Sequence, residues 1–217
     1  MQRLTRVQSG LTVKEYAALA RLTTPIKIQN FLDTIPMNWE KKGDTYMSPQ
    51  RVLCEKKAHC IEGALLAATA LWIQGEPPLI MNVSARLGKG DVDHVITLYK
   101  RGGRYGAISK TNYAVLRFRD PVYRTPRELI LSYFNEWFLG ETGEKTLECY
   151  SKPVDMRRFG HDWITKKEDV WDIADALSAL PHYYLVPKGN WQYVRNADQM
   201  ELTAGNLMEW PKSNPRT

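Results

Sequence analysis

The chain has few cysteines and no long apolar run, and each scarcity excludes a class of protein. Three cysteines in 217 residues, at positions 54, 60 and 149, cannot form the disulfide framework of a small secreted domain. The longest apolar stretch, residues 64–73, is too short to cross a bilayer. Residues 1–16 lack the apolar segment of a signal peptide. We therefore expect a cytoplasmic protein without a membrane contact, whose thiols stay reduced and available for chemistry.

A strong excess of one charge is also missing. The 30 Lys and Arg and 24 Asp and Glu residues give a net charge of +6, and the basic residues are scattered along the chain. Because no recognised nucleic-acid motif accompanies this moderate charge, we do not expect a nucleic-acid partner. With 43% apolar and 25% charged residues, the chain resembles an ordinary globular protein with a sizeable core. The sequence indicates no oligomeric state.

Capping residues and apolar periodicity predict helices in the N-terminal part. Thr12, followed three residues later by Glu15, is typical of a helix start, and Thr24 and Ser48 each precede a proline that suits a first turn. The clearest helix begins at Cys60, is rich in Ala and Leu, and is closed by a glycine and two prolines. The predicted helices span residues 12–22, 24–35, 48–56 and 60–74.

The pattern then changes to short apolar segments separated by glycine-rich turns, which is typical of strands. The predicted strands span residues 79–85, 94–100, 105–109 and 113–118, and a helix is predicted over 125–138. The composition shifts after Gly140. We therefore expect a core over residues 1–140 and a Trp- and Tyr-rich extension of unassigned role over 141–217, with one helix at 167–180. The predicted class is α+β, with N-terminal helices and a central Cys-bearing helix packed on a small antiparallel sheet.

One group of polar residues has the order that thiol catalysis needs. Cys60 begins the central helix, where unpaired N–H groups and the helix dipole favour a thiolate. His94 opens a predicted strand, and a histidine there can reach the start of a helix packed against the sheet. Ser109 or Asn112, at the end of the paired strand, could orient the imidazole. The sequence thus predicts Cys60 as a nucleophile and His94 as its base.

These segments resemble the transglutaminase-like superfamily, which has a papain-like cysteine fold. The resemblance covers residues 24–140 and is carried by AHCIEGALLAATALWIQGEPPLIMNV, DHVITLY and RYGAISKTN; a branch of small bacterial proteins is the most similar. In that family an Asp follows the catalytic histidine by roughly the spacing that Ser109 and Asn112 have here. Neither residue brings the negative charge of Asp. Asp93, the neighbour of His94, should point to the opposite face of its strand.

The resemblance implies a cysteine-dependent acyl transfer on a peptide or protein amide, ending in hydrolysis or transamidation, without a cofactor. A cell-wall amidopeptidase of the papain-like type is a second enzyme hypothesis, which the missing export signal disfavours. The alternative is a weak or inactive binding module for a protein or acidic partner. Cys54, His59, Cys60 and His94 lack paired zinc-ligand spacing, so we expect no metal. His59 should lie about 100° around the helix from Cys60 and serve as a cap or surface residue, with a place at the rim of a site as the second interpretation.

Overall fold

The computed structural model describes residues 2–40 and 43–209, and its N-terminal part is helical. Three helices begin where the sequence predicts, because the side chains of Thr12, Thr24 and Ser48 each accept a backbone N–H from the first turn. A four-residue helix at the N-terminus was not predicted. The five helices are α1 (Arg6–Ser9), α2 (Val13–Ala20), α3 (Pro25–Asp33), α4 (Pro49–Glu55) and α5 (Cys60–Ile73).

Seven strands form one antiparallel sheet in the described part of the chain, which confirms the α+β class. The strands are β1 (Leu79–Ala85), β2 (His94–Arg101), β3 (Arg104–Ile108), β4 (Arg119–Tyr123), β5 (Leu147–Ser151), β6 (Val154–Asp155) and β7 (His182–Tyr184). Their order is β4-β3-β2-β1-β5-β7, and β6 pairs with the other end of β1. The remaining elements are α6 (Pro126–Phe134), α7 (Trp171–Ser178), α8 (Gln199–Gly205) and the 3-10 helices η1 (Ala114–Leu116), η2 (Met156–Phe159), η3 (Asp162–Ile164) and η4 (Asn190–Tyr193).

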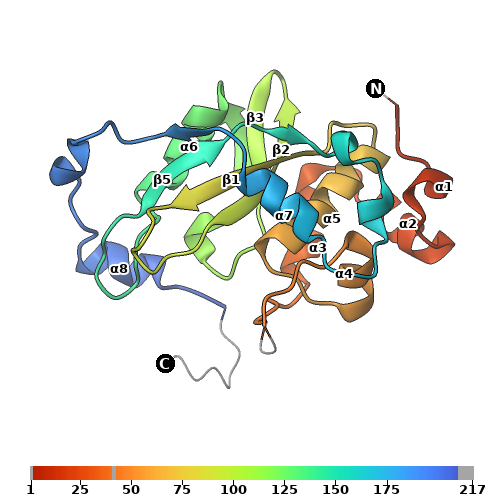
Figure 1. Ribbon diagram of the computed structural model, residues 1–217, viewed down its shortest axis with the longest axis horizontal. Helices are drawn as coiled ribbons and strands as arrows, with labels where there is room; N and C mark the ends of the chain where they lie inside the picture. Colours follow the sequence, from red (N-terminus) through yellow and green to blue (C-terminus); the bar gives the residue numbers. More distant parts are fainter. Residues whose placement is uncertain (1, 41–42, 210–217) are drawn as a thin grey trace.

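The sheet separates two apolar cores. Helices α2 to α5 gather on one side of it, while α6 lies away from them behind the strands (Figure 1). Every residue of α5 after Cys60 is buried, so this helix is the centre of the larger core. Thr97 of β2 donates its hydroxyl to the Ala64 carbonyl oxygen at 2.7 Å, which fixes the first turns of α5 against the sheet. The start of α5 is thereby held beside the start of β2.

The structure differs from the sequence-based expectations in four places. Residues 113–118 do not form a strand, because Tyr113 makes only an isolated bridge with Met208, Ala114–Leu116 form η1, and β4 begins at Arg119. The helix predicted over 125–138 ends at Phe134, which leaves Trp137 outside it. Residues 141–217 also add strands to the sheet, since β5 pairs with β1 and β7 pairs with β5. The helix expected over 167–180 is shorter, Trp171–Ser178.

Within the described residues, no helix combines the length and the apolar character needed to cross a membrane.

Close packing of α5 gives a first testable prediction. A methyl group added at Gly63 would overlap Cβ of Lys110 and lie 2.9 Å from its Cγ. Lys110 cannot easily move, because its Nζ donates to the carbonyl oxygens of Ile35 at 2.5 Å and Leu32 at 3.2 Å. In an open helix, Gly→Ala would stabilise by about 1 kcal/mol. We expect Gly63→Ala instead to lower the free energy of unfolding by about 2 kcal/mol, measured by urea denaturation. A more stable variant would contradict this packing.

Candidate active site

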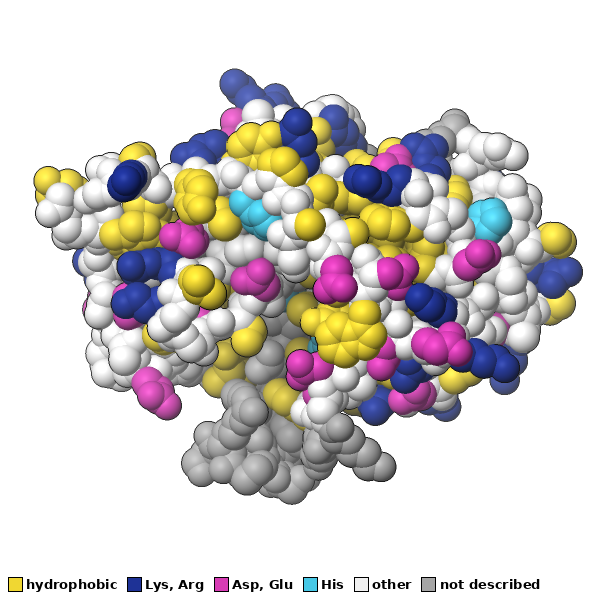
Figure 2. Space-filling model, in the orientation of Figure 1, with side chains coloured by type: hydrophobic (Ala, Val, Ile, Leu, Met, Phe, Trp, Pro, Cys, Tyr) yellow, Lys and Arg dark blue, Asp and Glu magenta, His cyan; other side chains and the backbone are white. Residues whose placement is uncertain are grey.

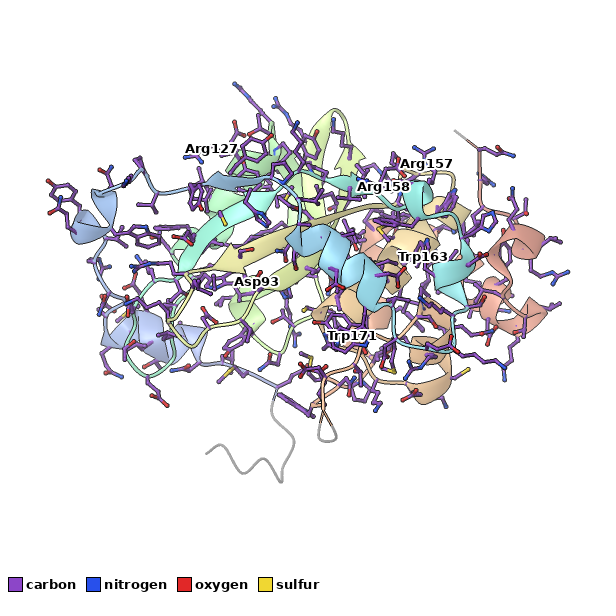
Figure 3. All side chains as sticks on the ribbon, in the orientation of Figure 1. Asp93, Arg127, Arg157, Arg158, Trp163 and Trp171 are labelled. Carbon is purple, nitrogen blue, oxygen red and sulfur yellow. The ribbon has the colours of Figure 1, made fainter. Side chains whose placement is uncertain are left out.

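A cleft of about 1010 Å³ opens where the start of α5 meets the start of β2. Figure 2 shows acidic side chains around a hollow near the centre of this face. In Figure 3, Asp93 lies on the side of the strands and Trp171 on the side of α7, where its ring packs on Tyr46 at 4.2 Å between centroids. Besides Cys60, His59 and His94, the lining includes aromatic residues (Trp39, Tyr46, Tyr113, Trp137, Phe138) and carboxylates (Glu40, Asp44, Asp91, Asp93, Glu136).

Cys60 is the first residue of α5, and its side chain is partly exposed in this cleft. Burial raises the pKa of the thiol. Hydrogen bonds to His59 and His94 and the charges of the two rings lower it by more than burial raises it, so that the pKa is about 5. The N–H groups of the first helical turn act in the same direction, because they and the helix dipole favour an anion. The arrangement stabilises a thiolate at neutral pH.

His94 is held in one orientation by a chain of hydrogen bonds. Its Nε2 lies 2.8 Å from Ser109 Oγ, and Ser109 Oγ donates to the carbonyl oxygen of Leu116 at 2.9 Å. Because the single hydroxyl hydrogen of Ser109 is used on Leu116, His94 Nε2 must be the donor to Ser109. In a neutral ring, Nδ1 then keeps its lone pair. That nitrogen is free of the Ser109 bond and can take up a proton.

Two further residues fix this part of the cleft. Gln29 of α3 clamps the backbone of Ser109: its Oε1 accepts the Ser109 N–H, and its Nε2 donates to the Ser109 carbonyl oxygen, both at 2.9 Å. Trp137 meets the His94 ring edge-on, with centroids 6.0 Å apart, and its Nε1 donates to Asp91 at 2.9 Å. Trp137 lies beyond the end of α6 and lines the cleft, although the helix predicted over 125–138 would have included it.

The other candidates for the third position point elsewhere. Asn112 lines the cleft, but its side-chain Nδ2 donates to Met208 Sδ at 3.7 Å, and its backbone carbonyl oxygen accepts the Glu209 N–H. Asp93 accepts from Ser84 at 2.9 Å and from the Ala85 N–H at 3.0 Å, so its carboxylate is held against β1. The structure thus brings Cys60, His94 and Ser109 together and turns Asn112 toward the C-terminal segment.

His59 is the N-cap residue of α5, but its ring faces Cys60, whereas the sequence predicted that it would turn away. As the N-cap of α5 it has an extended backbone, with φ −101° and ψ −168°, so the helical rotation of 100° per residue does not apply to it. Its Nδ1 lies 3.8 Å from Cys60 Sγ, and its Nε2 lies 2.6 Å from the carbonyl oxygen of Thr45. A carbonyl oxygen only accepts, so Nε2 carries a hydrogen. A second imidazole therefore faces the thiol.

Behind His59 lies Glu62, a fully buried carboxylate. Its Oε1 accepts from Thr45 Oγ1 at 2.8 Å and from the Met47 N–H at 3.0 Å, while its Oε2 accepts from the His59 N–H at 2.9 Å and from Asn38 Nδ2 at 3.2 Å. Burial raises the pKa of Glu62, but the hydrogen bond and charge of His59, with the backbone donors, bring it below its ordinary value of 4.5. Glu62 is therefore ionised at neutral pH.

The charge of the cleft is opposite to that of the whole chain. Among the residues that the structure describes, five carboxylates line it, against one lysine, Lys110, whose Nζ is turned to backbone carbonyls. Glu136 is paired with Arg119. Glu40 lies 3.4 Å from His59 Nε2. The cleft therefore suits a neutral or positively charged molecule better than an acidic one.

The other cysteines lie away from this site. Cys54 is exposed, with Sγ 3.7 Å from Glu15 Oε1, and Cys149 is buried in β5. Burial raises the pKa of both thiols, that of Cys149 to about 11. In the described ranges, no group of three or more His, Cys, Asp and Glu side chains is arranged to hold a metal ion.

Comparison with protein-family models gives no match for this chain, and comparison with curated proteins gives none either. The geometry of the cleft is therefore the basis on which a function can be assigned.

Proposed function

We propose that this chain is a cysteine-dependent acyl-transfer enzyme of the transglutaminase-like or papain-like type, acting on a peptide or protein amide. The observation that carries the proposal is the placement of Cys60. A partly exposed cysteine whose thiol has a lowered pKa lies at the start of a buried helix, beside an imidazole whose orientation is fixed. Structural cysteines in cores have the opposite character, as Cys149 does.

The order of elements supports the same family. The Cys-bearing helix α5 precedes β1, β2 begins with the histidine, and Ser109 follows the paired strand β3 directly. This is the order of cysteine, histidine and orienting residue that the sequence resemblance implies. Ser109 replaces a carboxylate by a neutral hydroxyl, so His94 is oriented here without a compensating negative charge on that side.

The proposed reaction uses these residues in two steps. Cys60 Sγ, as a thiolate, attacks the amide carbonyl carbon, and N–H groups at the start of α5 stabilise the oxyanion. His94 delivers a proton to the amide nitrogen, the C–N bond breaks, and the amine leaves a thioester on Cys60. In the second step water or another amine attacks the thioester and gives a proton to His94. The C–S bond then breaks and the thiolate is restored.

The acidic lining bears on the substrate. Glu40, Asp44 and Asp91 face the cleft, and its aromatic side chains can pack against extended chain or against cationic groups. We therefore expect amide substrates with Lys or Arg near the scissile bond to react faster than matched substrates with Asp or Glu. Amines that carry further positive charge should likewise be the better acceptors if the acyl group is transferred.

The experiment that tests this function is capture of the acyl-enzyme. The protein is incubated with a mixed peptide library and quenched in acid, and the peptide that contains Cys60 is examined by mass spectrometry. We expect thioester adducts on Cys60 and none on Cys54 or Cys149, with Cys60→Ser as the variant that loses them. Free peptide products without added amine would indicate hydrolysis, whereas products joined to added amine would indicate transamidation.

A binding module on the same fold is the second candidate, and the neutral Ser109 favours it. Such a module needs no reactive thiol. The Cys60→Ser variant would therefore bind peptides as well as the unchanged protein does, and the unchanged protein would show no adduct at any pH. The acidic cleft makes a basic segment, and not an acidic partner, the expected ligand of that module.

A further inference from the structure

Two imidazoles approach Cys60, and the buried carboxylate lies behind the one that the sequence did not assign. His59 Nδ1 lies 3.8 Å from Cys60 Sγ, while its Nε2 lies 3.4 Å from Glu62 Oε1 and 3.4 Å from Glu40 Oε1. His94 is backed by the Ser109 hydroxyl and a backbone carbonyl oxygen, which are both neutral. The negative charge that is missing behind His94 is thus present behind His59.

We propose that His59, backed by Glu62, is a positioning residue that stays protonated and holds Cys60 as a thiolate, so that His94 alone moves protons during acyl transfer. This inference rests on the proposed function, since it divides the work of that reaction between two histidines. The ion pair between the Cys60 thiolate and the His59 imidazolium is then already formed before a substrate binds. The site would therefore be active without an acidic residue at the position of Ser109.

The hydrogen bonds of His59 favour its charged form. Nε2 must carry a hydrogen because it faces the carbonyl oxygen of Thr45, and Nδ1 faces a sulfur that accepts best as a thiolate. Removing charges from water is costly, but a cation between two anions recovers that cost when all three are hydrogen-bonded. Burial lowers the pKa of His59, yet the bonds and charges of Cys60 and Glu62 raise it to about 11.

The surrounding charges agree with this assignment. From α5, His59 is faced by Cys60 and Glu62; from the segment before α4, by Glu40, Asp44 and Tyr46, whose ring meets it edge-on at 5.8 Å. Across the cleft, the basic side chains in the described part of the chain are His94 on β2 and Lys110, and Lys110 directs its Nζ to the carbonyls of Leu32 and Ile35. The groups nearest to His59 are thus mainly anionic.

A strongly held imidazolium cannot also be the proton donor. General acids work best when their pKa lies near the operating pH, and an imidazolium whose pKa is raised well above its ordinary value by Cys60 and Glu62 is a poor donor at neutrality. His94 has a neutral hydrogen-bond partner and an Nδ1 outside that bond, so it can give a proton to the leaving nitrogen and recover one from the water or amine that attacks the thioester.

The test is the pH dependence of iodoacetamide alkylation at Cys60, followed by peptide mass spectrometry. His59→Asn and His94→Asn are compared as matched variants, with His161→Asn as a control at an exposed histidine and Cys54 and Cys149 as internal references. We expect His59→Asn to raise the apparent pKa of Cys60 by at least about 2 units, so that alkylation at pH 6 slows at least about tenfold. We expect His94→Asn to raise it by less than about 1 unit.

Equal profiles in His59→Asn and the unchanged protein would overturn the inference, and so would a larger shift in His94→Asn. Either result would leave the proposed function in place, with His94 as the sole partner of the thiol. Failure of the proposed function has a different signature: a low-pKa Cys60 that forms no acyl-enzyme. Should His59→Asn not fold, ¹⁵N NMR of the unchanged protein decides, because His59 must carry hydrogens on both ring nitrogens at pH 7.5.

Discussion

Replacing His94 with alanine is expected to slow amide turnover by about 10³-fold, because a positioned general acid–base typically contributes 10²- to 10⁴-fold. Without the ring, the leaving nitrogen receives no proton in the first step, and water is not deprotonated in the second. Ser109 Oγ also loses the hydrogen bond that it accepts from His94 Nε2 at 2.8 Å. The thiol remains, so Cys60 should still be alkylated readily at pH 7 while acyl transfer is nearly lost.

The measurement is single-turnover release of amine from a peptide that the adduct experiment has identified. Free imidazole added to His94→Ala should restore part of the rate, since the deleted ring leaves space in an open cleft. Ser109→Ala is the companion variant, with a smaller loss, because it removes the orienting oxygen but keeps the base. Unchanged turnover in His94→Ala would remove this residue from the mechanism and leave the binding module as the better hypothesis.

The parts of the site that sequence could predict are those carried by local rules. A Cys at a helix start, a His at a strand start and a Ser at the end of the next strand follow from capping and periodicity, and the bounds of β1 were predicted to the residue. Because β2 and β3 form a hairpin, the start of β2 with His94 and the end of β3 next to Ser109 lie at the same end of the strand pair, away from the turn. The closeness of His94 and Ser109 therefore follows from strand pairing alone, without knowledge of any side-chain contact.

The role suggested for His59 depended on a rule that did not apply. A rotation of 100° per residue holds between helical residues, but the N-cap has an extended backbone, so its side chain can lie beside that of the next residue. The partners of Glu62 were also invisible in sequence. Asn38, Thr45 and Met47 come from an irregular segment without periodicity, and their convergence on one carboxylate is a tertiary contact.

The C-terminal strands escaped prediction for a related reason. β6 and β7 have two and three residues, too short for an alternating pattern to be recognised. β5 follows a turn-rich stretch whose change in composition suggested a boundary, yet it pairs with the central strand β1. Gln29 and Trp137 were read as parts of helices, and their contacts with Ser109 and His94 arise only when α3 and the segment after α6 pack beside the sheet.

A Glu62→Gln protein is expected to lose about 3 kcal/mol of unfolding free energy at pH 7, as buried charged groups do when a partner is removed. The carboxylate accepts four hydrogen bonds from Asn38, Thr45, Met47 and the His59 N–H. A Gln side chain has one acceptor oxygen and an NH₂ group that would face donors. Glu201→Gln is the matched control: Glu201 also accepts its N-cap N–H in a capping box, but it is partly exposed, so its loss should cost less than about 1 kcal/mol.

The pH dependence of that difference tests whether the charge itself is responsible. The pKa of Glu62 is lower in the folded protein than its ordinary 4.5, so the folded state binds this proton less readily than the unfolded state. The contribution of Glu62 is therefore fully present above pH 4.5 and is lost as the pH falls through the folded-state value. Urea denaturation followed by tryptophan fluorescence should show a constant gap between the unchanged protein and Glu62→Gln from pH 5.5 to 7.5, and a narrowing gap in more acidic solution. A gap that stays the same at pH 3.5 would mean that shape and neutral hydrogen bonds stabilise this network, and His59 would then have no buried anion to keep it charged.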